Sequence, residues 1–216
     1  MRNGALMTGI VLLFCFAGCS RGASEFATLQ RQAAAGDVIA QYNLGSVYAE
    51  GDGVPRNAVK AAQWFLKAAE SGDVDAQYCL AAMYDDGEGV EEDDSAAAKW
   101  YLEAAKQGDQ LSQYNVAVMY DDGIGVEQDF VQAMHWYRQA AEQGDIGGQI
   151  SIGMMYQLGE GVMADQAVAY AWFLLAADNG HSDVERKCSL LKEQLNEEDL
   201  SKGTTLHLEL AERYGM

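Results

Sequence analysis

Residues 40–54 read AQYNLGSVYAEGDGV, and this pattern returns as AQYCLAAMYDDGEGV at 76–90, SQYNVAVMYDDGIGV at 112–126 and GQISIGMMYQLGEGV at 148–162. The copies are 36 residues apart. The same spacing separates three columns of one residue type: Trp64, Trp100, Trp136 and Trp172; Tyr48, Tyr84, Tyr120 and Tyr156; and Gly36, Gly72, Gly108, Gly144 and Gly180. A fixed period of about 20 to 50 residues indicates stacked supersecondary units.

Each 36-residue unit predicts two helices. Within residues 40–50, Ala40, Leu44, Val47 and Tyr48 follow the i, i+4, i+7, i+8 spacing of a helix that is buried on one face. Residues 58–70 show a similar apolar face. We call the first helix of each unit helix A and the second helix B.

The residues between the helices are suited to ending one helix and starting the next. Gly51 and its copies fit the left-handed residue that ends helix A, and the second glycine of each G-x-G fits a tight return. N-cap oxygens are expected from Asn57, Asp93, Asp129 and Asp165 for helices B, and from Asp37, Asp73, Asp109 and Asp145 for helices A.

Small residues indicate where helices cross closely. Gly45, Ala81, Ala117 and Gly153 form one such column, and the larger Trp, Tyr and Leu columns fill the remaining space. A single helix pair cannot bury its apolar face, so at least three stacked units are expected. The sequence therefore predicts an all-α fold, a right-handed α-solenoid of antiparallel helix pairs with helical caps.

The two halves of the repeated pattern, A-x-x-x-L-G-x-x-Y-x-x-G-x-G-V and A-x-x-W-x-x-x-A-A-x-x-G, resemble the Sel-1-like repeats, relatives of the tetratricopeptide repeats. The resemblance covers about residues 36–180. It implies four repeats at 37–72, 73–108, 109–144 and 145–180, after a half-repeat at 25–36. Residues 181–216 lack the tyrosine and glycine columns and are expected to form capping helices, with breaks near Asn196 and Gly203.

The first residues are typical of an export signal. An apolar run from Ala5 to Ala17 is too short for a membrane-spanning helix, which needs about 20 residues. The run ends in FAGC, residues 16–19, which resembles the lipobox of bacterial lipoproteins. The resemblance implies a signal peptide at 1–18, a lipid on Cys19, a tether at 19–24 and, because Ser20 follows, the outer membrane. An ordinary cleaved signal is the alternative.

Composition and motifs argue against several functions. With 14 basic and 33 acidic residues the net charge is −19, which excludes a nucleic-acid partner that requires clustered Lys and Arg. His135, His181 and His207 lack metal-ligand spacing, and no nucleophile, phosphate-loop or metalloprotease motif occurs. We therefore expect no enzyme activity, no metal and no cofactor.

The two cysteines of the repeat and cap regions are expected to stay unpaired. Cys79 and Cys188 lie three repeats apart, and a disulfide needs α-carbons within about 7 Å. Buried packing is their expected role. Cysteine-rich relatives staple each repeat with a disulfide, and β-lactam binding or hydrolysis has been proposed for some of them; this chain departs from that pattern.

Helix A carries the candidate binding residues on the face opposite its buried side. By resemblance to tetratricopeptide arrays, this face lines a concave groove. Equivalent positions form a first row of Tyr42, Tyr78, Tyr114 and Ile150, a second row of Ser46, Ala82, Val118 and Met154, and a third row of Ala49, Asp85, Asp121 and Gln157. The alternative is that the tyrosines pack against a neighbouring helix.

These features predict a non-enzymatic adaptor or scaffold of the bacterial envelope, which binds a protein or peptide and touches the membrane only through its lipid. Two alternatives belong to other classes. One is an enzyme acting on cell-wall or β-lactam substrates. The other is a passive structural or cation-binding protein, for which the acidic turn DDGEGVEEDD at 85–94 is the candidate.

Overall fold

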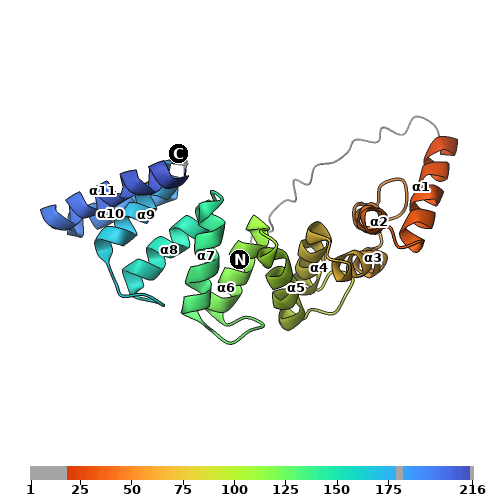
Figure 1. Cartoon of the computed structure of the whole chain (residues 1–216), viewed down its shortest axis with the longest axis horizontal. Helices are drawn as coiled ribbons and strands as arrows, with labels where there is room; N and C mark the ends of the chain where they lie inside the picture. Colours follow the sequence, from red (N-terminus) through yellow and green to blue (C-terminus); the bar gives the residue numbers. More distant parts are fainter. Residues whose placement is uncertain (1–18, 179–181, 215–216) are drawn as a thin grey trace.

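The computed structural model describes residues 19–178 and 182–214, and these form eleven helices and no strand. Figure 1 shows them as an arc of stacked helices that runs from α1 to α11. Their bounds are α1 Cys19–Ala34, α2 Val38–Glu50, α3 Ala58–Glu70, α4 Val74–Asp86, α5 Asp94–Lys106, α6 Gln110–Asp122, α7 Phe130–Glu142, α8 Ile146–Leu158, α9 Gln166–Asp178, α10 Ser182–Gln194 and α11 Glu197–Tyr214.

The helix pairs confirm the predicted solenoid. Helices A are α2, α4, α6 and α8, and helices B are α3, α5, α7 and α9. Helices α1 to α10 pack mainly on their neighbours in the chain, as expected when each repeat touches only the next one, whereas α11 packs mainly on α9. No helix in the described ranges is long and apolar enough to cross a lipid bilayer.

The predicted helix caps are confirmed. Oδ1 of Asp37 accepts a hydrogen bond from the Ala40 N–H at 2.8 Å, and Asp73, Asp109 and Asp145 do the same for the later helices A. Gly51 ends α2 with a φ of 79°, in the left-handed region that a side chain disfavours. Asn57 caps α3, and its aspartate equivalents cap α5, α7 and α9.

The second glycine of each turn connects one repeat to the one before it. A β-carbon at Gly89 would overlap the backbone of Ala58 at the start of α3. Gly125 and Gly161 lie in the same way against the first residues of α5 and α7. Gly53 has no atom within 4 Å of that position, because no full repeat precedes it. The turns therefore help to hold successive repeats together.

Within a repeat, a ring of helix B packs against the small residue of helix A. A β-carbon at Gly45 would lie 2.6 Å from the Phe65 ring, and one at Gly153 would lie 2.6 Å from the Phe173 ring. This confirms that these two members of the column permit a close helix crossing. The apolar residue beside them is fully enclosed, as Leu44 and Ile152 show.

A column of buried glutamines, which the sequence analysis did not identify, donates hydrogen bonds to backbone carbonyl groups at the C-terminal ends of α1, α3 and α5. The Nε2 atoms of Gln41, Gln77 and Gln113 donate to the carbonyl oxygens of Ala33, Ala69 and Ala105 at 3.1–3.2 Å. In two repeats a second glutamine completes the arrangement: Gln107 donates to Gln77 Oε1 at 2.7 Å and Gln143 donates to Gln113 Oε1 at 2.8 Å.

The ends of the array differ from the expectation in two places. Helix α1 begins at Cys19, so residues 19–24, expected as a tether, lie in that helix. Asn196 caps α11 through the Asp199 N–H at 2.8 Å, but the expected break at Gly203 is wrong. Gly203 lies inside α11, and a β-carbon there would be 2.7 Å from the Ala167 carbonyl oxygen. The glycine therefore permits α11 to press on the start of α9.

Cys79 and Cys188 are free and buried, which confirms the expectation that they do not form a disulfide. Cys79 packs in the N-terminal core with Tyr78 and Ala82. Cys188 packs in the C-terminal core with Val184 and Leu191. Burial raises the pKa of the Cys79 thiol to about 12, which keeps this sulfur in its unreactive protonated form.

Ser112 is a buried polar residue whose removal should stabilise the fold. Its Oγ has no hydrogen-bond partner among the described residues, whereas the equivalent positions hold Ala40 and Ala76. We expect Ser112→Ala to raise the free energy of unfolding by about 1 kcal/mol, because a buried unpaired hydroxyl is costly. Urea denaturation measures this. Ala76→Ser is the reciprocal control and should destabilise the protein. If neither variant changed the urea midpoint of unfolding, the Ser112 hydroxyl would not be a source of instability.

Gln41 offers a second test in the first repeat. Its Oε1 has no partner in the described part of the chain, because Ser71 stands where Gln107 and Gln143 donate in later repeats. Ser71→Gln should supply the missing donor and stabilise the protein by about 1 kcal/mol in the same measurement. Ser71→Ala adds no donor and should not stabilise the protein. Equal urea midpoints for Ser71→Gln and Ser71→Ala would contradict the proposed hydrogen bond to Gln41.

Candidate functional site

The tyrosine row of helices A is both packed and partly exposed. The ring centroids of Tyr42, Tyr78 and Tyr114 each lie 5.8 Å from those of Phe65, Tyr101 and Tyr137 on helix B of the same repeat. All three tyrosines are nevertheless only half-buried, and so is Ile150 in the fourth repeat. One side of each ring therefore contributes to the core, and the rest of the side chain is accessible to a partner.

Carboxylates lie close to these tyrosines. Burial raises the pKa of the Tyr42 phenol to about 12, with further contributions from the charges of Asp75 and Asp73. Burial likewise raises the pKa of Tyr78 and Tyr114, helped by carboxylates of the following repeat, Asp109 and Asp145. The phenols therefore stay neutral, in surroundings of negative potential.

The second row becomes more exposed along the array. Ala82 and Val118 are half-buried, whereas Met154 is 40% exposed. One turn further along α8, Leu158 is 61% exposed. The equivalent residues of the earlier repeats are Glu50, Asp86 and Asp122, so a comparison of the columns would have revealed this apolar site in the sequence.

In the third repeat, the third-row residue Asp121 forms a hydrogen bond with helix B. The Tyr137 hydroxyl donates to Asp121 Oδ2 at 3.2 Å. Burial raises the pKa of Asp121, and the neighbouring charges of Asp122 and Glu160 raise it further, while the Tyr137 hydrogen bond opposes them. The Asp121 carboxylate therefore has a structural role, whereas Asp122, the next residue of α6, is exposed.

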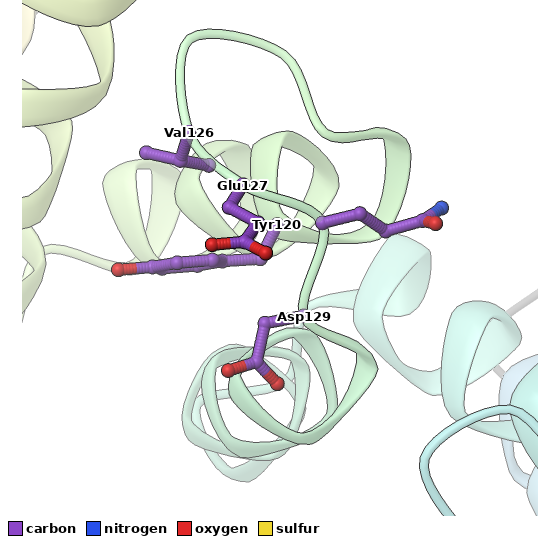
Figure 2. Close-up of a pocket in the computed structure, with 5 residues that line it drawn as sticks. Tyr120, Val126, Glu127 and Asp129 are labelled. Carbon is purple, nitrogen blue, oxygen red and sulfur yellow. The ribbon is translucent and has the colours of Figure 1, made fainter.

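An open pocket lies at the turn between helices A and B of the third repeat (Figure 2). Tyr120, Val126, Glu127, Gln128 and Asp129 line it. Asp129 already accepts hydrogen bonds from the N–H groups of Val131 and Gln132 at 2.9 and 3.1 Å, so its carboxylate caps α7. The lining holds no Ser, Thr, Cys, Lys or His, and its second carboxylate is that of Glu127.

Within the described residues, no group of three His, Cys, Asp or Glu side chains is placed to hold a metal ion. Two acidic residues of the turns are in ion pairs: Glu88 with Arg56, and Asp165 with Lys202 at 2.6 Å. His135 is exposed, and His207 Nε2 lies 2.7 Å from Asp178 Oδ2. His181 and the side chain of Cys19, the expected lipid site, lie outside what the structure describes.

Solved structures of known proteins share this architecture. A Sel1 repeat protein from Oxalobacter formigenes is 28% identical, with a TM-score of 0.72 over 91% of this chain and 85% of its own. A protective antigen of uropathogenic Escherichia coli strains, which displays an SLR fold, is 28% identical, with a TM-score of 0.56 over 88% of this chain. The chain spans 48% of that antigen's length. A search of curated proteins found no match.

The family model named Sel1 repeat matches residues 38–73, 74–109, 110–145 and 147–181. These four matches cover helices α2 to α9, the part of the solenoid that carries the tyrosine row and the G-x-G turns. Proteins built from such repeats generally mediate protein–protein interactions. The chain belongs to the Sel1 repeat family.

Proposed function

We propose that this protein is a non-enzymatic adaptor of the bacterial envelope that binds a protein partner in a concave groove, lined by the face of helices A opposite their buried side. The face comprises the rows of Tyr42 and Ser46 with their copies, and the exposed ends of α6 and α8. The observation that carries the proposal is the row of half-buried tyrosines, because tyrosine offers a large, amphipathic contact area at low entropic cost.

The shape of the array supports the same function. A solenoid presents an extended surface instead of one deep pocket, and equivalent side chains recur at each repeat. Such a surface suits an extended segment of a partner, which can contact several repeats at once. The second row provides Ala82, Val118 and Met154 as apolar contacts between the tyrosines and the acidic ends of the helices.

Attachment to the envelope is proposed through Cys19. The FAGC sequence at residues 16–19 supports cleavage before this cysteine and addition of lipid to its thiol. Several acyl chains, each contributing about 0.8 kcal/mol per buried methylene, would hold the protein stably on a membrane. Ser20 after the cysteine supports the outer membrane as its location.

Site-specific photocross-linking tests the proposed face. A photoreactive residue in place of Met154, on helix A, should capture a partner in intact cells. The matched control is Gln63, an exposed residue of helix B. Adducts at Met154 that are absent at Gln63 would support binding on the A side. Equal adducts at both positions, or adducts at Gln63 alone, would reject this face.

The lipid anchor is tested separately. Cys19→Ala should abolish labelling by radioactive palmitate and release the protein from the membrane fraction, because it removes the thiol proposed to carry the lipid. Cys79→Ala is the control and should change neither result, since Cys79 is buried in the solenoid. Palmitate labelling that persists in Cys19→Ala would overturn the proposed attachment site.

A further inference from the structure

The two sets of helices differ sharply in charge. The four helices A, which are α2, α4, α6 and α8, contain no Lys, Arg or His at all. Their charged residues are all acidic: Glu50, Asp75, Asp85, Asp86, Asp121 and Asp122. Helices B of the first three repeats instead mix both signs, and their basic residues include Lys60, Lys67, Lys99, Lys106 and Arg138. Helices A thus hold only six of the chain's 33 acidic residues, but they carry no cations of their own, whereas helices B do.

The carboxylates of α4 and α6 lie on the same helices as Tyr78 and Tyr114 of the tyrosine row. The charge of Asp86 helps to raise the pKa of Tyr78, and the charges of Asp121 and Asp122 do the same for Tyr114. Asp86 and Asp122 themselves are exposed. These carboxylates lie about two helical turns from the rings in α4 and α6, so an extended segment could place a cation at the carboxylate and another side chain at the ring.

The charge does not extend to the fourth repeat. Helix α8 has no ionisable residue except Tyr156, and it presents Met154 and Leu158 to solvent in the rows where earlier repeats carry smaller or acidic residues. The face made by helices A is consequently acidic along α2, α4 and α6 and apolar at α8. The acidic part of this face would bind basic side chains of a ligand, and the part at α8 would bind apolar side chains of the same ligand.

We propose that helices A bind an extended basic segment of a partner protein, whose Lys and Arg side chains lie along α2, α4 and α6 and whose apolar end packs on Met154 and Leu158 of α8. The proposal rests on the adaptor function above and names the chemistry of its partner. Charge complementarity selects this occupant: an acidic segment or an anionic lipid surface would be repelled by the same carboxylates.

Three fluorescein-labelled peptides of about twelve residues, long enough when extended at about 3.3 Å per residue to cross several repeats, test the proposal. The first alternates Lys with Ser and ends in two Leu residues. The second replaces each Lys by Glu, and the third replaces both Leu residues by Ser. Fluorescence anisotropy with the full chain should give the tightest binding for the first peptide, more than about tenfold tighter than for the second, and the difference should shrink as salt rises.

Variants of the chain locate the binding. Asp86→Asn with Asp122→Asn should weaken binding of the first peptide about tenfold at low salt, mainly through slower association. Leu158→Gln, which removes the apolar contact without adding a charge, should reduce the affinity of the first peptide to that of the third. The matched control, Glu70→Gln with Glu142→Gln, removes two exposed charges from helices B and should leave binding unchanged.

The result that would overturn the proposal is equal binding of the first two peptides, or an equal effect of the helix A and helix B charge variants. This failure is distinguishable from failure of the adaptor function. If photocross-linking at Met154 captures a partner while the peptides show no charge preference, the adaptor function stands and the basic ligand is wrong. If cross-linking at Met154 captures no partner, the adaptor function itself fails.

Discussion

The structure depends on contacts between consecutive helix pairs, because no pair in this chain can bury its own apolar surface. Two close approaches make the stacking possible. Within a repeat, an aromatic ring of helix B fills the space left by a glycine, as Phe65 does at Gly45. Between repeats, the second glycine of a turn rests on the first residue of the preceding helix B, as Gly89 does on Ala58. Both approaches would be blocked by larger side chains.

The proposed binding face is a consequence of this stacking. Because one side of helix A is committed to the core, its opposite side recurs every 36 residues, and whatever that side carries is multiplied along the array. Single exposed charges contribute little, but several carboxylates of one sign on neighbouring helices produce a common field. Because the exposed side of helix A recurs in each repeat, the candidate site is a surface formed by α2, α4, α6 and α8 and not a cavity with one reactive group.

Most of the fold was predictable because the sequence contains four copies of one unit, so that each column of small, aromatic or capping residues is seen several times. The tyrosine row was also predictable, but not its double role, since a helical pattern cannot show that Tyr78 packs on Tyr101 while staying partly exposed. Gln77 was missed because glutamine in a helix is ordinarily a surface residue, whereas here it satisfies the carbonyl of Ala69. Gly203 was misjudged because it has no repeat copy, and a glycine in a helix can mark either a break or a close contact.

Helix α11 lies against α9 with Gly203 close to the Ala167 backbone, much as the turn glycines of earlier repeats lie on the helix B before them. It therefore occupies the docking surface to which a fifth repeat would have to add. An additional 36-residue unit could be accommodated only before α11, between existing repeats, where it would lengthen the surface formed by helices A and leave the contact between α11 and α9 unchanged.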